Sequence, residues 1–227
     1  MKIAGFQKLT LLDFPGKVSC ILFTQGCNFK CPYCQNSGLI GHENELLIDE
    51  EEIFSYLNKR KGVIDGVVIS GGEPTVQKDL KIFMKRVKDM GFLVKLDTNG
   101  SNPELLEEII QNNLVDYIAM DIKNPLPLYK EVTSVSPKQE KLKRSIDLLK
   151  TSSIDHEFRT TIIKNIHDID KIFEICSYVD GNKMFLQNFE QSENVLCKNL
   201  ESFSKEELLD IQKKMKGKYP NVKVRGI

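Results

Sequence analysis

The chain has 227 residues, of which 41% are hydrophobic and 28% charged, and its formal net charge is zero. This balance is typical of a globular protein, and we expect a single domain over residues 1–227. A neutral chain offers no basic patch for nucleic acid or an anionic membrane surface, so we expect neither as a direct partner. No segment reaches the roughly 18 apolar residues of a membrane span, and residues 1–17 carry charges and lack an apolar signal core. These features predict a cytoplasmic protein.

Apolar runs of strand length alternate along the chain with amphipathic helical patterns. Residues 1–16 predict a lead-in strand or hairpin that ends at a Pro-Gly turn, and residues 18–24 are typical of a parallel strand buried on both faces. Further strands are predicted at about residues 66–70, 92–96, 117–120, 157–163, 183–189 and 222–224. Helices are predicted at about residues 49–61, 80–91, 103–112, 142–149, 168–179 and 204–216.

This alternation of strands and helices, repeated about six times, predicts an α/β fold with a parallel sheet and right-handed crossovers. Six units are too few for an eight-stranded barrel, which leaves an open doubly wound sheet and a partial barrel as alternatives. Both place the functional face at the carboxyl ends of the strands. Polar segments follow four successive strands there: residues 27–34, 71–74, 97–100 and 121–123. We expect these four loops to converge on one site.

Three of the six cysteines, Cys27, Cys31 and Cys34, lie within eight residues in a C-x3-C-x2-C pattern. Thiolates favour iron–sulfur clusters, zinc and copper(I), and in a reducing compartment such spacing indicates metal ligands rather than disulfides. A cubane cluster normally takes four cysteines. One held here would leave an iron without a local protein ligand, as a catalytic site requires. A zinc site completed by His42 is the alternative.

The other cysteines and histidines are scattered along the sequence. Cys20 lies in an apolar run and is predicted to be a buried small side chain, whereas Cys176 and Cys197 have no assigned role. The histidines, which we expect to face solvent or to lie in loops, are His42, His156 and His167. The sequence lacks a Ser-His-Asp set, an H-E-x-x-H motif, a Walker A motif and G-x-G-x-x-G.

The remaining polar segments together suit a ligand with an amine, a carboxylate and a sugar. In residues 71–74, Gly-Gly-Glu-Pro, the glycines allow close backbone approach and the glutamate suits an ammonium group; the other interpretation is a tight turn. Asp97 and Asp121 can bind an ammonium group, a ribose hydroxyl or a cation. Lys123 is placed to meet a carboxylate, and Arg159 is expected to point into the mouth of the fold and pair with anions. Taken singly, each charged residue also suits a structural ion pair.

The motifs together resemble those of the radical S-adenosylmethionine (SAM) enzymes. The cysteine pattern with aromatic Tyr33 before its last cysteine is similar to the defining loop of that superfamily, and residues 71–74 are similar to its SAM amino-group motif. Residues 5–17 and the Cys34-Gln35-Asn36 segment resemble the activating proteins of anaerobic ribonucleoside-triphosphate reductases, which are glycyl-radical-enzyme activases. Residues 97–100 and 121–123 are similar to motifs of the pyruvate formate-lyase activase. The resemblance covers essentially the whole chain and implies a (β/α)6 partial barrel.

The resemblance also implies a role for each matching residue. Cys27, Cys31 and Cys34 would ligate three irons of a [4Fe–4S] cluster, and the amine and carboxylate of SAM would chelate the fourth. The implied SAM contacts are Tyr33 at the adenine; Gly71, Gly72, Glu73 and Asp97 at the amine; Lys123 at the carboxylate; and Asp121, Arg159 and Gln187 near the carboxylate or ribose. A monovalent cation is implied near Asp97, Thr98 and Asp121. Gln187 stands where the formate-lyase activase pattern has a histidine, which disfavours formate lyase as the target.

The implied activity is reductive cleavage of SAM to a 5′-deoxyadenosyl radical, which generates a glycyl radical on an anaerobic (class III) ribonucleotide reductase. A small electron donor such as flavodoxin or ferredoxin would reduce the one cluster expected. Within the superfamily, another glycyl-radical-enzyme activase and a small-molecule enzyme such as 7-carboxy-7-deazaguanine synthase stay open. Outside it, the alternatives are an iron–sulfur electron carrier and a zinc-stabilised interaction module.

Overall fold

The computed structural model describes residues 1–41 and 46–226, so His42, the alternative zinc ligand, lies outside the described residues. The chain divides into two compact units. The first comprises residues 1–28, 38–98 and 104–119, and the second comprises residues 29–37, 99–103 and 120–227. The expectation of one domain over residues 1–227 stays a prediction.

The first unit is built on a mostly parallel sheet. Its strands are β1 (Ile3–Thr10), β2 (Ser19–Thr24), β3 (Gly66–Gly71), β4 (Leu93–Thr98) and the start of β5 (Tyr117–Asp121). Strand β1 pairs antiparallel with β2, so residues 1–16 supply a single lead-in strand whose partner lies outside that segment. Strands β2, β3 and β4 pair in parallel, with Val68 opposite Ile21 on one side and Lys95 on the other. Their carboxyl ends therefore lie at one edge of this sheet.

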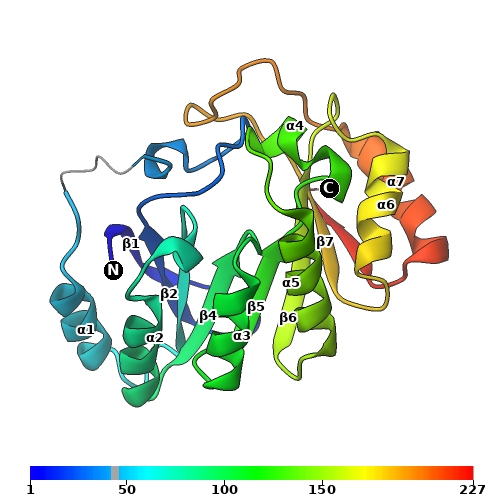
Figure 1. Cartoon of the computed structure of the whole chain (residues 1–227). Helices are drawn as coiled ribbons and strands as arrows, with labels where there is room; N and C mark the ends of the chain where they lie inside the picture. Colours follow the sequence, from blue (N-terminus) through cyan, green and yellow to red (C-terminus); the bar gives the residue numbers. More distant parts are fainter. Residues whose placement is uncertain (42–45, 227) are drawn as a thin grey trace. The chain divides into compact units, whose positions relative to one another are not determined.

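The helices of the first unit lie on one face of this sheet, as Figure 1 shows for α1 and α2. They are α1 (Glu50–Lys59), α2 (Leu80–Asp89) and α3 (Pro103–Gln111). Asp49 caps α1 by accepting a hydrogen bond of 3.1 Å from the N–H of Glu51. Helix α2 buries Leu80, Phe83 and Met84, the apolar stripe that its sequence predicts. The apolar stripe thus fixes which side of α2 contacts the sheet.

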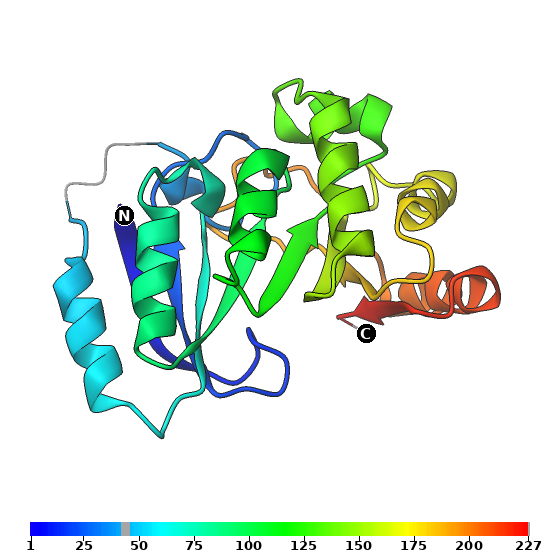
Figure 2. The ribbon, with the colours of Figure 1, turned by 60° about the horizontal axis from the view of Figure 1, so that its bottom comes forward.

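The second unit contains a parallel sheet of β6 (Asp155–Ile162), β7 (Met184–Asn188) and β8 (Val222–Arg225). The N–H of Ile122 donates to the carbonyl oxygen of Arg159 at 2.8 Å, so the chain leaving β5 pairs with β6. The main helices are α5 (Gln139–Thr151), α6 (Ile169–Tyr178) and α7 (Lys205–Lys218), which run alongside these strands in Figure 2. Ser204 and Glu207 form the predicted capping box at the start of α7.

One helix of the second unit, α4 (Tyr129–Thr133), was not predicted from the sequence. It follows a short 3₁₀ helix, η3 (Leu126–Leu128), inside the segment that its prolines marked as a loop. Five residues are too few for a helical period to be visible in the sequence. The helix nevertheless buries Tyr129 and Val132, and Tyr129 belongs to the site described below. Within the described part of the chain, no helix has the length and apolar character needed to cross a bilayer.

Candidate functional site

Glu73 connects the loop after β3 to the end of β4 within the first unit. The residue is 1% exposed. Its Oε1 accepts hydrogen bonds from the backbone N–H of Thr75 at 3.1 Å, the Thr75 hydroxyl at 2.5 Å and the Thr98 hydroxyl at 2.7 Å. The carboxylate thereby caps the short 3₁₀ helix η2 (Pro74–Val76). Glu73 thus has a structural role in addition to the amine contact predicted for it, which stays a prediction.

Gly71 and Gly72 bring the loop after β3 against the segment that leads into the cysteines. The N–H of Gly72 donates to the carbonyl of Thr24 at 2.9 Å, and that of Glu73 donates to the carbonyl of Gly26 at 2.9 Å. A Cβ at Gly71 would lie 2.2 Å from the nitrogen of Thr24, and one at Gly72 would lie 2.1 Å from the oxygen of Gly26. Gly71 also has a φ of +112°. Close packing against the neighbouring backbone therefore requires glycine at both positions, whether or not a ligand is bound.

Asp97, at the end of β4, bonds to Ser70 and Lys95 in the first unit. Its Oδ2 accepts a hydrogen bond of 3.1 Å from the Ser70 hydroxyl, and its Oδ1 pairs with the ammonium group of Lys95. The side chain of Lys95 is only 3% exposed. Because Lys95 and Asp97 are two residues apart on one strand, their side chains point to the same face of the sheet. This spacing is visible in the sequence and could have identified Lys95 as the partner of Asp97.

Asp121, Lys123 and Arg159 form an ion-pair cluster in the second unit. Arg159 donates its Nε–H to Oδ1 of Asp121 at 2.9 Å, and Nζ of Lys123 lies 3.3 Å from Oδ2. Burial alone would raise the pKa of Asp121, but Arg159 and Lys123 outweigh it and hold that pKa below its usual value. Burial would likewise lower the pKa of Lys123, but the Asp121 carboxylate holds it well above its usual value. Asp121 and Lys123 are therefore both charged at neutral pH, and a guanidinium such as that of Arg159 always is, so this cluster presents cationic groups to an approaching anion.

The backbone of Lys123 is held on both sides by buried side chains. Its N–H donates to the hydroxyl oxygen of Tyr129 at 3.0 Å, and its carbonyl oxygen lies 3.1 Å from Nε2 of His167. Tyr129 is 2% exposed and His167 is fully buried. The sequence singled out neither residue, because both bond to main-chain atoms of Lys123, and a main-chain partner leaves no complementary residue type in the sequence.

The predicted placement of the described histidines needs correction. His167 does lie in a loop, but it is buried. Hydrogen bonds to the backbone at both ring nitrogens allow this burial. His156 is neither in a loop nor solvent-facing: β6 begins earlier than predicted and includes it. Its half-buried ring lies 2.8 Å from the carbonyl of Ile154 and 3.1 Å from Oδ1 of Asn182.

The cysteines of the motif are divided between the two units, with Cys27 in the first and Cys31 and Cys34 in the second. The N–H of Cys34 donates to the carbonyl of Cys31 at 3.1 Å, which closes a turn. Burial raises the pKa values of both thiols, with Lys123 acting in the opposite direction. Within residues 1–41 and 46–226, no three His, Cys, Asp or Glu side chains are grouped so as to hold a metal ion. The three-cysteine ligand set stays a prediction.

Tyr33 supplies the observation that tests whether this site suits a cofactor. The residue is 6% exposed, and its hydroxyl has no oxygen or nitrogen partner among the described residues; its neighbour is the Cys31 thiol. Sulfur is a weak acceptor and compensates a buried hydroxyl only in part. Burial raises the pKa of Tyr33, so the hydroxyl keeps its proton, and Lys123 and Asp121 are charged groups close enough to affect it. A buried hydroxyl with only a weak sulfur acceptor, together with soft thiols, fits an iron–sulfur cluster whose bound ligand presents acceptor atoms.

Gln187, the last of the predicted contacts, lies in β7 with Thr161 and Arg225 opposite it in the neighbouring strands. It is half-buried. The hydrogen bonds found among the described residues include none from its side chain, and its contact with ribose stays a prediction.

Residues 190–198, which we call the strap, lie against the cysteine loop within the second unit; they follow β7 and are coloured orange in Figure 1. Gln35 donates from Nε2 to the carbonyl of Glu190 at 2.6 Å and accepts from the Ser192 hydroxyl at 2.6 Å. The N–H of Cys197 donates to the carbonyl of Pro32 at 2.9 Å. These contacts give the Gln35 of the Cys-Gln-Asn segment a structural role.

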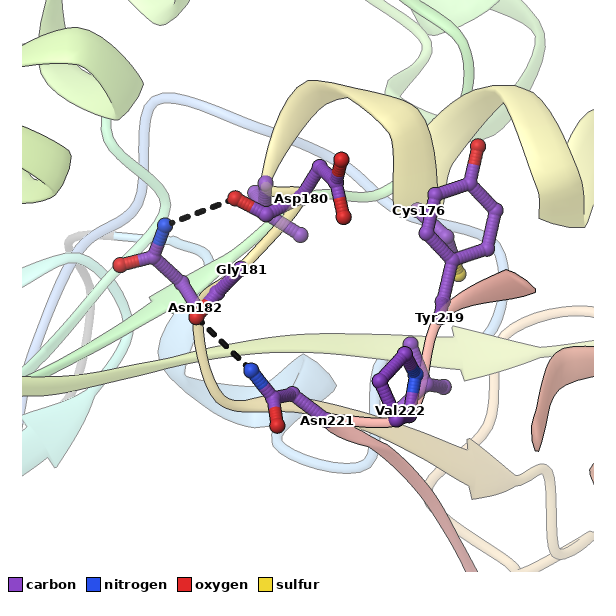
Figure 3. Close-up of a pocket in the computed structure, with 9 residues that line it drawn as sticks. Cys176, Asp180, Gly181, Asn182, Tyr219, Asn221 and Val222 are labelled. Carbon is purple, nitrogen blue, oxygen red and sulfur yellow. Dashed lines mark hydrogen bonds between the residues drawn. The ribbon is translucent and has the colours of Figure 1, made fainter. Parts of the chain in front are cut away.

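A cavity of about 60 Å³ lies at the opposite ends of β7 and β8, beside Cys176 and Tyr219 (Figure 3). Asn221 donates from Nδ2 to the carbonyl of Gly181 at 2.8 Å across its rim. It is lined by Cys176 and residues 179–182, which precede β7, and by residues 219–222 at the start of β8, and none of the predicted site residues lines it. This cavity is therefore separate from the predicted site.

Comparison with known proteins identifies the family. The sequence profile of the Radical SAM superfamily matches residues 21–176. A Methanocaldococcus jannaschii protein named as a candidate glycyl-radical enzyme activating enzyme is 37% identical over 234 aligned positions, which cover 99% of this chain and 96% of that protein. The GTP 3′,8-cyclase of Campylobacter jejuni is 27% identical; the match covers 84% of this chain and 61% of the cyclase.

A solved structure shows the same fold. Streptococcus suis SuiB bound to its precursor peptide SuiA superimposes with a TM-score of 0.69 at 16% identity, over 91% of this chain and 48% of SuiB. The predicted partial barrel with a mostly parallel sheet is thereby confirmed. Membership of the superfamily implies a [4Fe–4S] cluster and SAM as cofactors, and it makes the chain an enzyme in place of the electron carrier or zinc module considered above. This chain belongs to the radical SAM superfamily.

Proposed function

We propose that this radical SAM enzyme generates a glycyl radical on a partner enzyme, and that the partner is an anaerobic (class III) ribonucleoside-triphosphate reductase. The observation that carries the activase assignment is the match to the M. jannaschii protein, which extends over nearly the full length of both chains. The narrower choice of reductase rests on residues 5–17 and on Gln35 and Asn36, which resemble the reductase-activating proteins.

The chain's own residues bind and orient the cofactors. The proposed cluster ligands are Cys27, Cys31 and Cys34. Within the second unit, Lys123 meets the carboxylate of SAM, while Asp121 fixes the ammonium group of Lys123 at 3.3 Å. A cluster held by these cysteines would supply one electron to SAM, so that the C5′–S bond breaks to leave methionine and a 5′-deoxyadenosyl radical, which would take a hydrogen atom from a glycine Cα of the partner and become 5′-deoxyadenosine.

The other proposed SAM contacts keep the assignments made from the sequence. They are Tyr33 at the adenine, Gly71, Gly72, Glu73 and Asp97 at the amine, and Asp121, Arg159 and Gln187 near the carboxylate or ribose. In the first unit, three hydrogen bonds to Glu73 and the Ser70 bond to Asp97 hold these carboxylates in place. A flavodoxin or ferredoxin is the proposed electron donor, and a monovalent cation at Asp97, Thr98 and Asp121 stays a prediction.

A radical SAM enzyme that acts on a small molecule is the second candidate. The observation that favours it is the match to the C. jejuni GTP 3′,8-cyclase over 84% of this chain. The two candidates differ in where hydrogen is removed: from a protein backbone in the first and from a free metabolite in the second.

Electron paramagnetic resonance on an anaerobic mixture tests the proposal. The mixture contains the reconstituted protein, a reductant, SAM and the anaerobic ribonucleotide reductase of the same organism. We expect a glycyl-radical doublet that is absent without SAM and absent with Cys31→Ala. Formation of 5′-deoxyadenosine without the doublet would reject this partner while retaining the radical chemistry. Substitution of another glycyl radical enzyme, or of GTP, then separates the alternatives.

A further inference from the structure

Lys123 lies just beyond the last residue of its segment that forms a backbone hydrogen bond to a neighbouring strand. Strand β5 ends at Asp121, and the N–H of Ile122 still pairs with the carbonyl of Arg159 in β6 at 2.8 Å. One residue later, both backbone groups of Lys123 bond to side chains instead. Buried backbone groups need partners, so these side chains replace the strand ladder at this residue.

The hydrogen bonds around His167 fix its tautomer. The N–H of Ile163 donates to Nδ1 at 3.0 Å, and because a backbone amide can only donate, Nδ1 carries no proton. The proton therefore sits on Nε2, which donates to the carbonyl oxygen of Lys123 at 3.1 Å. Burial lowers the pKa of His167 and keeps the ring neutral. The ring thus links the chain just beyond β6 to the backbone of Lys123.

Tyr129 acts from the other side of the same residue. Its hydroxyl oxygen accepts the N–H of Lys123 at 3.0 Å, and α4 carries it as its first residue. The ring of Phe29, at the start of the cysteine loop, packs edge-on against the ring of Tyr129, with the two ring centroids 6.4 Å apart. Lys123 is thereby tied both to α4 and to the loop that precedes α6.

We propose that His167 and Tyr129 are positioning residues that hold the backbone of Lys123 so that its ammonium group meets the carboxylate of SAM. The proposal rests on the SAM-binding role given to Lys123 above. Neither residue touches the ligand in this scheme. A flexible lysine anchored only by its own side chain would lose more conformational entropy on binding a carboxylate, so the fixed backbone favours affinity.

The SAM dissociation constant of the cluster-loaded protein, measured anaerobically by equilibrium dialysis, tests the proposal. His167→Gln can keep a donor near the position of Nε2, whereas the shorter His167→Asn cannot reach the Lys123 carbonyl. We expect His167→Asn to weaken SAM binding about tenfold, the value of one to two lost hydrogen bonds, and His167→Gln to stay within about threefold of the parent. Tyr129→Phe should weaken binding about fivefold. His156→Asn, a matched control in β6, should leave the constant unchanged.

A double-mutant cycle separates positioning from general stability. In the background of Lys123→Gln, we expect His167→Asn to add less than a twofold loss, because the group that it positions is gone. An equal loss in both backgrounds would show a structural role alone and overturn the inference. So would parent-like SAM binding by His167→Asn. Should His167→Asn fail to fold, the same cycle is run with Tyr129→Phe, for which the same outcomes count.

The inference and the proposed function fail in different ways. If Lys123→Gln binds SAM as tightly as the parent, the role assigned to Lys123 is wrong, and the positioning role falls with it. If Lys123→Gln weakens binding but neither His167→Asn nor Tyr129→Phe does, only the positioning role is wrong. The glycyl-radical experiment is unaffected by either result, since it tests the partner.

Discussion

Arg159 donates the hydrogen on its Nε to Oδ1 of Asp121 at 2.9 Å, although the two residues lie 38 positions apart in the sequence. The bond joins the end of β5 to the middle of β6, and the other oxygen of the same carboxylate faces Lys123 at 3.3 Å. One carboxylate therefore sets the position of two cations, and removing its charge should affect both.

The first prediction concerns Asp121→Asn and the pH dependence of stability. The pKa of Asp121 is lowered in the folded protein, because Arg159 and Lys123 outweigh the effect of burial. A carboxyl group whose pKa is lowered by folding stabilises the folded state at pH values above its unfolded-state pKa, about 3.9 for Asp. This stabilisation is lost as the pH falls through the folded-state pKa. At pH 7 we expect the substitution to lower the free energy of unfolding by about 1–3 kcal/mol, since it removes the carboxylate charge that faces two partly buried cations.

Urea unfolding of the parent and Asp121→Asn from pH 7 to pH 3 is the measurement. The difference between the two proteins should narrow below about pH 4. Asp89→Asn is the control, because Asp89 forms an exposed pair with Lys85 and is expected to change stability by less than about 0.5 kcal/mol. A difference that stays constant across this pH range would contradict the prediction.

The second prediction separates cluster ligands from the other cysteines. We expect Cys31→Ala to reconstitute with less than about half the iron of the parent and to lose it rapidly, because a three-thiolate set cannot be completed. Cys197→Ala is the matched control: its N–H bond to Pro32 involves only the backbone and survives the substitution. Iron and sulfide analysis with the visible absorption spectrum measures both. Equal iron loss in the two variants would contradict the assignment of Cys31.

Local signals in the sequence predicted the helices and the sheet. Asp49 and Ser204 cap helices where the sequence places caps, and the apolar stripe of α2 is buried as its spacing requires. Such signals act within one turn of a helix or along one strand, so they can be read without a structure. The five-residue α4 carried no such signal and was missed.

The parts of the site that the sequence did not predict act over long distances in the chain. His167 lies 44 positions from the backbone that it supports, and Gln35 lies 155 positions from its partner in the strap. The bonds from His167 and Gln35 end on backbone carbonyls, so no complementary residue type marks them in the sequence. Lys95 is the exception, since its spacing from Asp97 is visible.

The third prediction tests the reason for a glycine at position 72. A Cβ there would lie 2.1 Å from the carbonyl oxygen of Gly26 and 3.2 Å from that of Thr24, and both oxygens are backbone atoms that cannot move independently of the chain. We expect Gly72→Ala to destabilise the protein by more than about 2 kcal/mol and to lower cluster content, because the segment entering the cysteine loop must shift. Gly38→Ala, which meets nothing within 4 Å, is the control and should change both by little. Thermal unfolding together with iron analysis is the measurement, and parent-like values for Gly72→Ala would show that the loop adapts without cost.

The fourth prediction concerns the strap. Gln35→Ala removes the hydrogen bonds to Glu190 and Ser192, so the segment after Cys34 should open more often to oxygen. We expect the cluster to bleach about three to ten times faster in air, measured by its visible absorption. Gln191→Ala is the control, because among the residues that the structure describes its side chain bonds only to the next residue along the strap, and it should bleach at the parent rate.

Ser192 provides the sharper version of this experiment. Its hydroxyl donates to Oε1 of Gln35, so Ser192→Ala should accelerate bleaching in the parent but add nothing once Gln35 is alanine. Non-additivity of this kind follows only if both residues act through one hydrogen bond. An additive acceleration would mean that Ser192 stabilises the strap by another route, and the contact with Gln35 would then not be what protects the cluster.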